Sequence, residues 1–216
     1  MDNVLNESEV RILACLIEKE MTTPEYYPLS LNSLTNACNQ KSNRNPVVSY
    51  EETDVAQGLE SLQGKGLVRK TLTPGSRVPK YRHAILDRFD LSNQEMAILS
   101  ELMLRGPQTV GELRGRTERI YSFTDLAEVD ATLADLADSG YVTRLPRMAG
   151  RKESRYAHLL AGPVELEQQT PAPEPAVLAV RAENERITLL EEELQKLRQD
   201  FDALQAEFMA FKKEFE

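Results

Sequence analysis

Apolar residues recur at helical spacing behind a polar capping pair near the start of the chain. Val10, Leu13 and Ile17 lie on one helical face and follow Asn6 and Glu9. An Asn at the N-cap accepts a hydrogen bond from the third helical residue, and a Glu at that position returns one. The spacing therefore predicts an amphipathic helix that begins after Asn6.

This arrangement returns later in the chain as part of an internal repeat. A second capping pair, Ser92 and Glu95, precedes Met96, Leu99 and Met103. Four blocks match in the same order, namely residues 5–13 with 91–99, 30–34 with 109–113, 55–68 with 129–142, and 81–83 with 156–158. Self-similarity of this kind indicates duplicated structural units. We therefore predict two homologous domains, at residues 1–88 and 89–162.

Each copy predicts three helices followed by a β-hairpin. A third capping pair, Thr109 and Glu112, opens the second helix of the second copy, and Gly66 and Gly140 end the third helices. We expect the hairpin strands at residues 67–72 and 81–85, and at residues 141–145 and 155–159. This order predicts a mainly α fold with small β-hairpins, arranged as tandem winged helix-turn-helix domains plus a C-terminal coiled-coil helix.

One polar stretch has a more specific signature. Residues 35–47, which read Thr-Asn-Ala-Cys-Asn-Gln-Lys-Ser-Asn-Arg-Asn-Pro-Val, resemble the YceH family of uncharacterised bacterial proteins, as do residues 16–20 and 23–30. The resemblance extends over about residues 5–160. It implies tandem winged helices, and it implies no particular reaction.

Composition and charge narrow the class of protein. The apolar content of 41% excludes wholesale disorder. The net charge is −9, and the tail from residue 163 onward, with six basic and thirteen acidic residues, supplies most of it. The longest aliphatic run, residues 12–17, is far shorter than the ~20 residues of a membrane-spanning helix, and the N-terminus lacks a signal-peptide pattern. With two Cys in 216 residues, we expect a cytoplasmic protein without a disulfide scaffold.

The third helices fit a DNA groove poorly. The first turn of one contains Glu51, Glu52 and Asp54, and the other begins with Asp125 and Glu128. Carboxylates stabilise a helix N-terminus, but phosphate groups would repel them. This pattern weighs against insertion of either third helix into the major groove.

The segment before the first of these helices carries the opposite signal. Residues 39–45 hold two cations and four amide side chains, which are the types that contact phosphates and base edges. Candidate nucleic-acid contacts are Lys41, Asn43, Arg44 and Asn45. The alternative is a surface loop in which these side chains satisfy turn backbone groups.

The predicted hairpins supply the remaining candidates for nucleic-acid contact. They are Arg77 and Lys80 in the first copy, and Arg147, Arg151 and Lys152 in the second. Contacts of this kind to the DNA backbone are salt-dependent and poor in sequence information. A solvated hairpin, or one that binds an acidic partner, explains the same residues.

Catalysis has little support in the sequence. Cys15 lies among apolar residues, and Cys38 has no His or second Cys beside it at metal-ligand spacing. His83 and His158 occupy equivalent strand positions, which indicates a shared packing role. We predict no catalytic, cofactor-binding or metal site and a protein that is not an enzyme.

The C-terminal part predicts a pairing helix behind a Pro-rich linker at residues 163–178. From residue 179 to 216 the apolar residues alternate in steps of three and four, as in a coiled coil. These positions are Ile187, Leu190, Leu194, Leu197, Phe201, Leu204, Phe208, Phe211 and Phe215. The flanking charges favour a parallel homodimer, while a trimer, a helix folded back on the body, or docking onto another protein stays open.

Two functional hypotheses follow. The first is a dimeric, non-enzymatic protein that binds double-stranded DNA and resembles a transcription regulator. The second is a protein-protein interaction scaffold that uses the winged-helix domains and the coiled coil. The pattern indicates no membrane partner.

Overall fold

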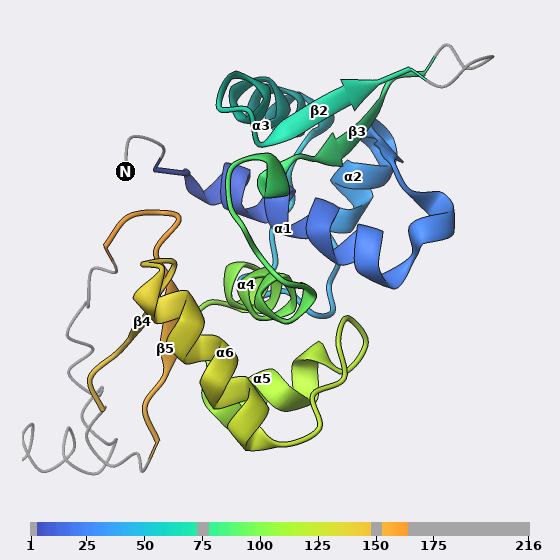
Figure 1. The fold of residues 1–216 in the computed structure, drawn as a ribbon. Coiled ribbons are helices and arrows are strands. Elements are labelled where there is room, and N and C mark those ends of the chain that lie inside the picture. The colour runs from blue at the N-terminus through green and yellow to red at the C-terminus, as the bar shows by residue number, and fades with distance from the viewer. Residues whose placement is uncertain (1–3, 73–77, 148–152, 164–216) are drawn as a thin grey trace, which may run out of the picture. The chain divides into compact units, whose positions relative to one another are not determined.

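The computed structural model describes residues 4–72, 78–147 and 153–163 of the chain (Figure 1). The first repeat runs through helix, short strand, two helices and a hairpin. Its elements are α1 (Glu7–Thr22), η1 (Pro24–Tyr26), β1 (Leu29–Ser30), α2 (Leu31–Cys38), α3 (Glu52–Gly64), β2 (Val68–Thr71), β3 (Lys80–His83) and η2 (Ile85–Asp87).

The second repeat follows the same order. Its elements are α4 (Asn93–Arg105), α5 (Val110–Thr117), α6 (Leu126–Asp138), β4 (Val142–Arg144) and β5 (Tyr156–His158). The described part of the chain is therefore mainly helical with small antiparallel sheets, as the sequence predicted.

The sheets repeat as well as the helices. In the first repeat the strand order is β1-β3-β2, and Leu29 lies opposite Tyr81. In the second repeat β4 pairs with β5, and an isolated bridge joins Gln108 to Tyr156, the equivalent of Tyr81. Each repeat thus has a hairpin whose second strand also meets the segment before the second helix.

All three predicted capping pairs are formed. The Asn6 side chain accepts from the Glu9 amide, and Glu9 accepts from the Asn6 amide. Ser92 and Thr109 make the same reciprocal bonds with their Glu partners. Gly66, which follows the C-terminal end of α3, has a φ of 71°, a left-handed conformation that glycine adopts at no steric cost.

The two repeats share one hydrophobic core. In α1, ten consecutive residues, 9–18, are buried, and in α4 residues 96–104 are buried. A helix buried all round needs neighbours on every side, and α1 has α2 and α3 on one side and α4 on the other (Figure 1). The chain divides into two compact units, at residues 1–164 and 165–216, so both repeats fall within one unit.

The predicted linker at 163–178 lies outside the described residues, apart from Pro163. The predicted coiled-coil helix at 179–216 and its nine core positions also lie outside them. Among the described residues, the helices are too short or too polar to cross a lipid bilayer.

Candidate nucleic-acid interface

The amide-rich segment 39–45 is largely used inside the molecule. The Arg44 side chain has no exposed surface, and its Nη2 lies 2.6 Å from a Glu18 carboxylate oxygen on α1. The guanidinium also donates to the Ala37 carbonyl oxygen, at 3.2 Å from Nε and 3.0 Å from Nη2. Arg44 was predicted to contact nucleic acid, and this prediction is wrong, because the buried ion pair leaves no group for a phosphate.

The two asparagines beside Arg44 bind the end of a helix from the other repeat. The backbone N–H of Asn45 donates to the Leu104 carbonyl at 2.9 Å. The side-chain oxygen of Asn43 accepts a hydrogen bond from the Arg105 guanidinium. The last carbonyls of a helix lack partners within the helix, so this segment caps α4. Asn43 and Asn45 therefore have a structural role between the repeats, and their contact with nucleic acid stays a prediction, since Asn45 is exposed and Asn43 half-buried.

Of the other predicted contacts, the structure describes Lys41, Lys80 and Arg147, and they come from three different segments of the chain. Lys41 is exposed, and Lys80 is half-buried in β3, opposite Thr71 of β2. The two hairpins lie on opposite sides of the α1–α4 pair (Figure 1). Arg147 is exposed on the second hairpin. Arg77, Arg151 and Lys152 lie outside the described residues.

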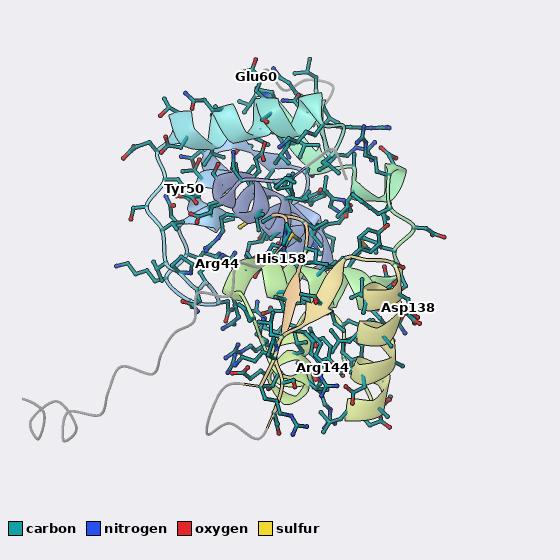
Figure 2. All side chains as sticks on the ribbon, turned by 90° about the vertical axis from the view of Figure 1, so that its left-hand side faces the viewer. Arg44, Tyr50, Glu60, Asp138, Arg144 and His158 are labelled. Carbon is teal, nitrogen blue, oxygen red and sulfur yellow. The ribbon has the colours of Figure 1, made fainter. Side chains whose placement is uncertain are left out.

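The third helices present carboxylates. Neither α3 nor α6 contains a Lys or Arg, and Glu60 on α3 and Asp138 on α6 are exposed (Figure 2). On α6, Asp130 and Asp135 are exposed as well. A phosphate backbone would be repelled along both helices.

A cationic surface lies at the second hairpin. It consists of Arg116 on α5, Arg144 and Arg147 at the end of β4, and Arg155 before β5, and we call these four residues the wing arginines. Arg155 lies 2.9 Å and Arg116 3.5 Å from carboxylate oxygens of Glu112. Glu112 therefore holds α5 against the hairpin and brings two of the cations together.

Local contacts fix this arrangement. Arg155 donates to the Pro107 carbonyl at 2.7 Å, and Arg116 donates to Gln108 Oε1 at 2.7 Å. Burial alone would raise the pKa of Glu112, but the Thr109 amide and Arg155 outweigh it and lower the pKa. The carboxylate thus stays ionised and keeps its two arginines in place.

The remaining two wing arginines are exposed to solvent. Arg144 and Arg147 are exposed, and within the described parts of the chain neither forms an ion pair with a carboxylate. Arg144 lies opposite Tyr156 in the hairpin, and Tyr156 directly follows Arg155. Figure 2 shows Arg144 and Glu60 of α3 at opposite ends of the view. Together the four wing arginines outnumber the two carboxylates of this region, Glu112 and the exposed Glu153.

Sequence reasoning missed part of this surface. It identified Glu112 only as a helix cap and did not consider Arg116. The spacing of Glu112 and Arg116, four residues apart on one helix, was the available signal.

The two cysteines and His83 belong to the first repeat, away in sequence from the wing arginines. Cys15 and Cys38 are buried free thiols. His83 contacts the Glu20 carboxylate, and its backbone N–H donates to the Tyr27 hydroxyl at 2.7 Å. Within the ranges that the structure describes, no three His, Cys, Asp or Glu residues cluster as a metal site would require.

Comparison with known proteins gives consistent matches. The profile of a family described as "Protein of unknown function, DUF480" matches residues 5–151. A "UPF0502 protein" from Geotalea uraniireducens is 58% identical over 198 residues, which are 90% of each chain. One from Geobacter sulfurreducens is 56% identical over 91% of each chain, and one from Pelobacter propionicus is 50% identical over all of both chains.

Proposed function

The chain belongs to the DUF480 family of uncharacterised bacterial proteins, and we propose that it is a non-enzymatic DNA-binding protein built from two winged helix-turn-helix domains. In this proposal the second hairpin contacts the phosphate backbone of double-stranded DNA. The order of helices and strands in both repeats supports the winged-helix assignment. The observation that carries the DNA proposal is that the second hairpin carries two exposed arginines, Arg144 and Arg147, beside two more, Arg116 and Arg155, that Glu112 holds in place.

The chemistry of this surface favours backbone contact over base recognition. Guanidinium groups bind phosphate oxygens in a bidentate manner. The carboxylates of α6 keep that helix out of the major groove, where sequence is read. The protein would therefore bind duplex DNA with little sequence preference and a strong dependence on salt.

The test is a salt titration with a fluorescent random-sequence duplex, read by anisotropy. Four phosphate contacts predict that affinity falls by about 150-fold between roughly 50 and 200 mM salt. The double variant Arg144→Ser/Arg147→Ser removes the two unpaired wing arginines and should lower the logarithmic salt slope by about 2.

Two substitutions serve as matched controls. Lys70 occupies the equivalent place to Arg144 in the first hairpin and is exposed, and Arg119 is an exposed arginine just after α5. Lys70→Ser and Arg119→Ser should leave the salt slope of the wild type within error. The proposal fails if these variants weaken binding as much as the double variant does, or if the wild type does not bind at low salt.

A second candidate function is that of a protein-interaction scaffold, and the third helices favour it. Their exposed carboxylates, without any Lys or Arg, fit a protein partner with a basic surface. Affinity capture from nuclease-treated lysate, with the wild type and with Asp130→Lys/Asp138→Lys, separates the two candidates. A partner lost only in this variant favours the scaffold, and no captured partner removes it.

We also propose that the chain self-associates through its C-terminal heptads. This proposal rests on the sequence pattern of residues 187–215 alone. Light scattering on the full-length protein should give a dimer, and Leu194→Lys/Leu197→Lys should give a monomer. A wild-type monomer at high protein concentration would refute it.

A further inference from the structure

A cavity lies where the two repeats meet, and the DNA-binding proposal does not use it. It is a pocket of about 220 Å³ that is partly open to solvent, with walls from α1 and the segment 45–50 of the first repeat and from α4 and β5 of the second. By volume it has room for about seven waters, which is the size of a small organic molecule. Its walls include the apolar side chains of Val10, Pro46, Leu102 and Met103.

One wall of the cavity carries a buried cation without a counterion. Arg11 is 4% exposed. Its guanidinium donates to the Pro46 carbonyl at 2.6 Å and to the Cys38 carbonyl at 3.4 Å, which leaves further N–H groups. Within the described residues Arg11 forms no ion pair. The exposed Glu7 also borders the cavity, but its carboxylate is not within ion-pair distance of Arg11.

Arg11 has no carboxylate within ion-pair distance among the described residues, whereas the other buried cation of this region has one. Arg44 is paired with Glu18, as described above. A buried charge is retained at a large desolvation cost unless an opposite charge or a set of hydrogen bonds offsets it. Arg11 thus offers charge and donors to a ligand that brings its own anion.

A second polar group faces the same cavity from the other repeat. His158 of β5 lines it, and its Nδ1 is buried without a hydrogen-bond partner. Buried polar atoms nearly always have a partner. A ligand with an oxygen at this point would satisfy Nδ1, and that oxygen could belong to the group that Arg11 binds.

We propose that this cavity is a binding site for a small monocarboxylate with an apolar body. The carboxylate pairs with Arg11 and accepts the Nδ1–H of His158. The apolar body packs against Leu102 and Met103. Because the walls come from both repeats, the bound acid stabilises their junction.

The test uses benzoate as the probe and benzamide as its neutral, equally sized control. Titration calorimetry on the full-length protein should give one benzoate site per chain, with benzamide at least ten-fold weaker. Arg11→Met should remove this preference for the anion. Val48→Trp, a bulky substitution at a half-buried cavity wall residue, should block both compounds.

The controls separate this site from surface binding. Arg119→Ser should bind benzoate like the wild type, because Arg119 lies outside the cavity. If Arg11→Met does not fold, the benzoate–benzamide comparison and Val48→Trp decide the matter. Equal binding of the two compounds, no binding at millimolar concentration, or undiminished binding in Val48→Trp would each overturn the proposal, and none of them would affect the DNA-binding proposal.

Discussion

Arg44 connects three parts of the first repeat through one buried side chain. Its Nη2 contacts Glu18 on α1, the Ala37 carbonyl on α2 and the Gln40 side chain. Removing one partner of a buried ion pair leaves the other charge uncompensated, which destabilises a protein by about 3–5 kcal/mol. We therefore expect Arg44→Ala to lower the free energy of unfolding by that amount in urea titrations followed by circular dichroism.

The matched control for Arg44 is its exposed neighbour Lys41. Lys41→Ala should change the free energy of unfolding by less than about 0.5 kcal/mol, as surface substitutions generally do. Equal midpoints for Lys41→Ala and Arg44→Ala would show that the buried pair contributes nothing to stability.

These two residues also show what sequence reasoning can and cannot separate. Lys41 and Arg44 lie three positions apart in one polar stretch, and composition assigned both to the surface. The partner of Arg44 is Glu18, which is 26 positions away along the chain. Only the three-dimensional packing of α1 against this segment decides which cation is buried.

His158 should make stability depend on pH. Burial lowers its pKa from the ordinary 6.5 to about 4. The unfolded chain binds a proton between these two values while the folded chain does not, so stability is lost as pH falls from about 6.5 towards 4. The full loss is about 3 kcal/mol at roughly 1.4 kcal/mol per pH unit.

Comparison with His158→Gln isolates this contribution from the other titrating groups. The difference in unfolding free energy between wild type and variant, measured in urea at pH 7 and pH 4.5, should shrink at the lower pH. A difference that stays constant would mean that His158 titrates normally in the folded protein.

At the scale of elements, the helix caps were predictable because they are local. Asn6 and Ser92 each accept from the amide of a Glu three positions later. Replacing such a cap by Ala costs about 1 kcal/mol. We expect Asn6→Ala and Ser92→Ala each to lower the thermal midpoint of the full-length protein, while Ser139→Ala, at the exposed C-terminal end of α6, leaves it unchanged. Midpoints that do not differ among the three variants would contradict this role.

The strands were predicted less accurately than the caps. The hairpins appear where expected, but β4 spans only Val142–Arg144 and β5 only Tyr156–His158. The short β1 and the bridge at Gln108 were missed. A strand of one or two residues has no alternation of polar and apolar positions, so its pairing depends on the hairpin that it meets.

At the scale of the whole molecule, the sequence predicted the repeat but not how its two copies join. Within the run Ile12–Ile17, the sequence analysis assigned Leu13 and Ile17 to the buried face of an amphipathic helix and found the run too short to cross a membrane. In the structure all six of its side chains are 0% exposed. A helix that is apolar all round and too short to cross a bilayer indicates burial between two layers, and this was the available signal for the shared core.

The shared core predicts that both repeats unfold together. The chain has no Trp, so Tyr26→Trp and Tyr121→Trp would each report on one repeat by fluorescence. Since α1 packs on α4, loss of either repeat would expose the other's core, and both reporters should share one urea midpoint with circular dichroism. Leu13→Ala in the buried α1 should lower the free energy of unfolding by about 2–5 kcal/mol. The urea midpoints of both reporters should fall equally. Two separate midpoints, or a shift confined to the Tyr26→Trp reporter, would show that the repeats are independent domains.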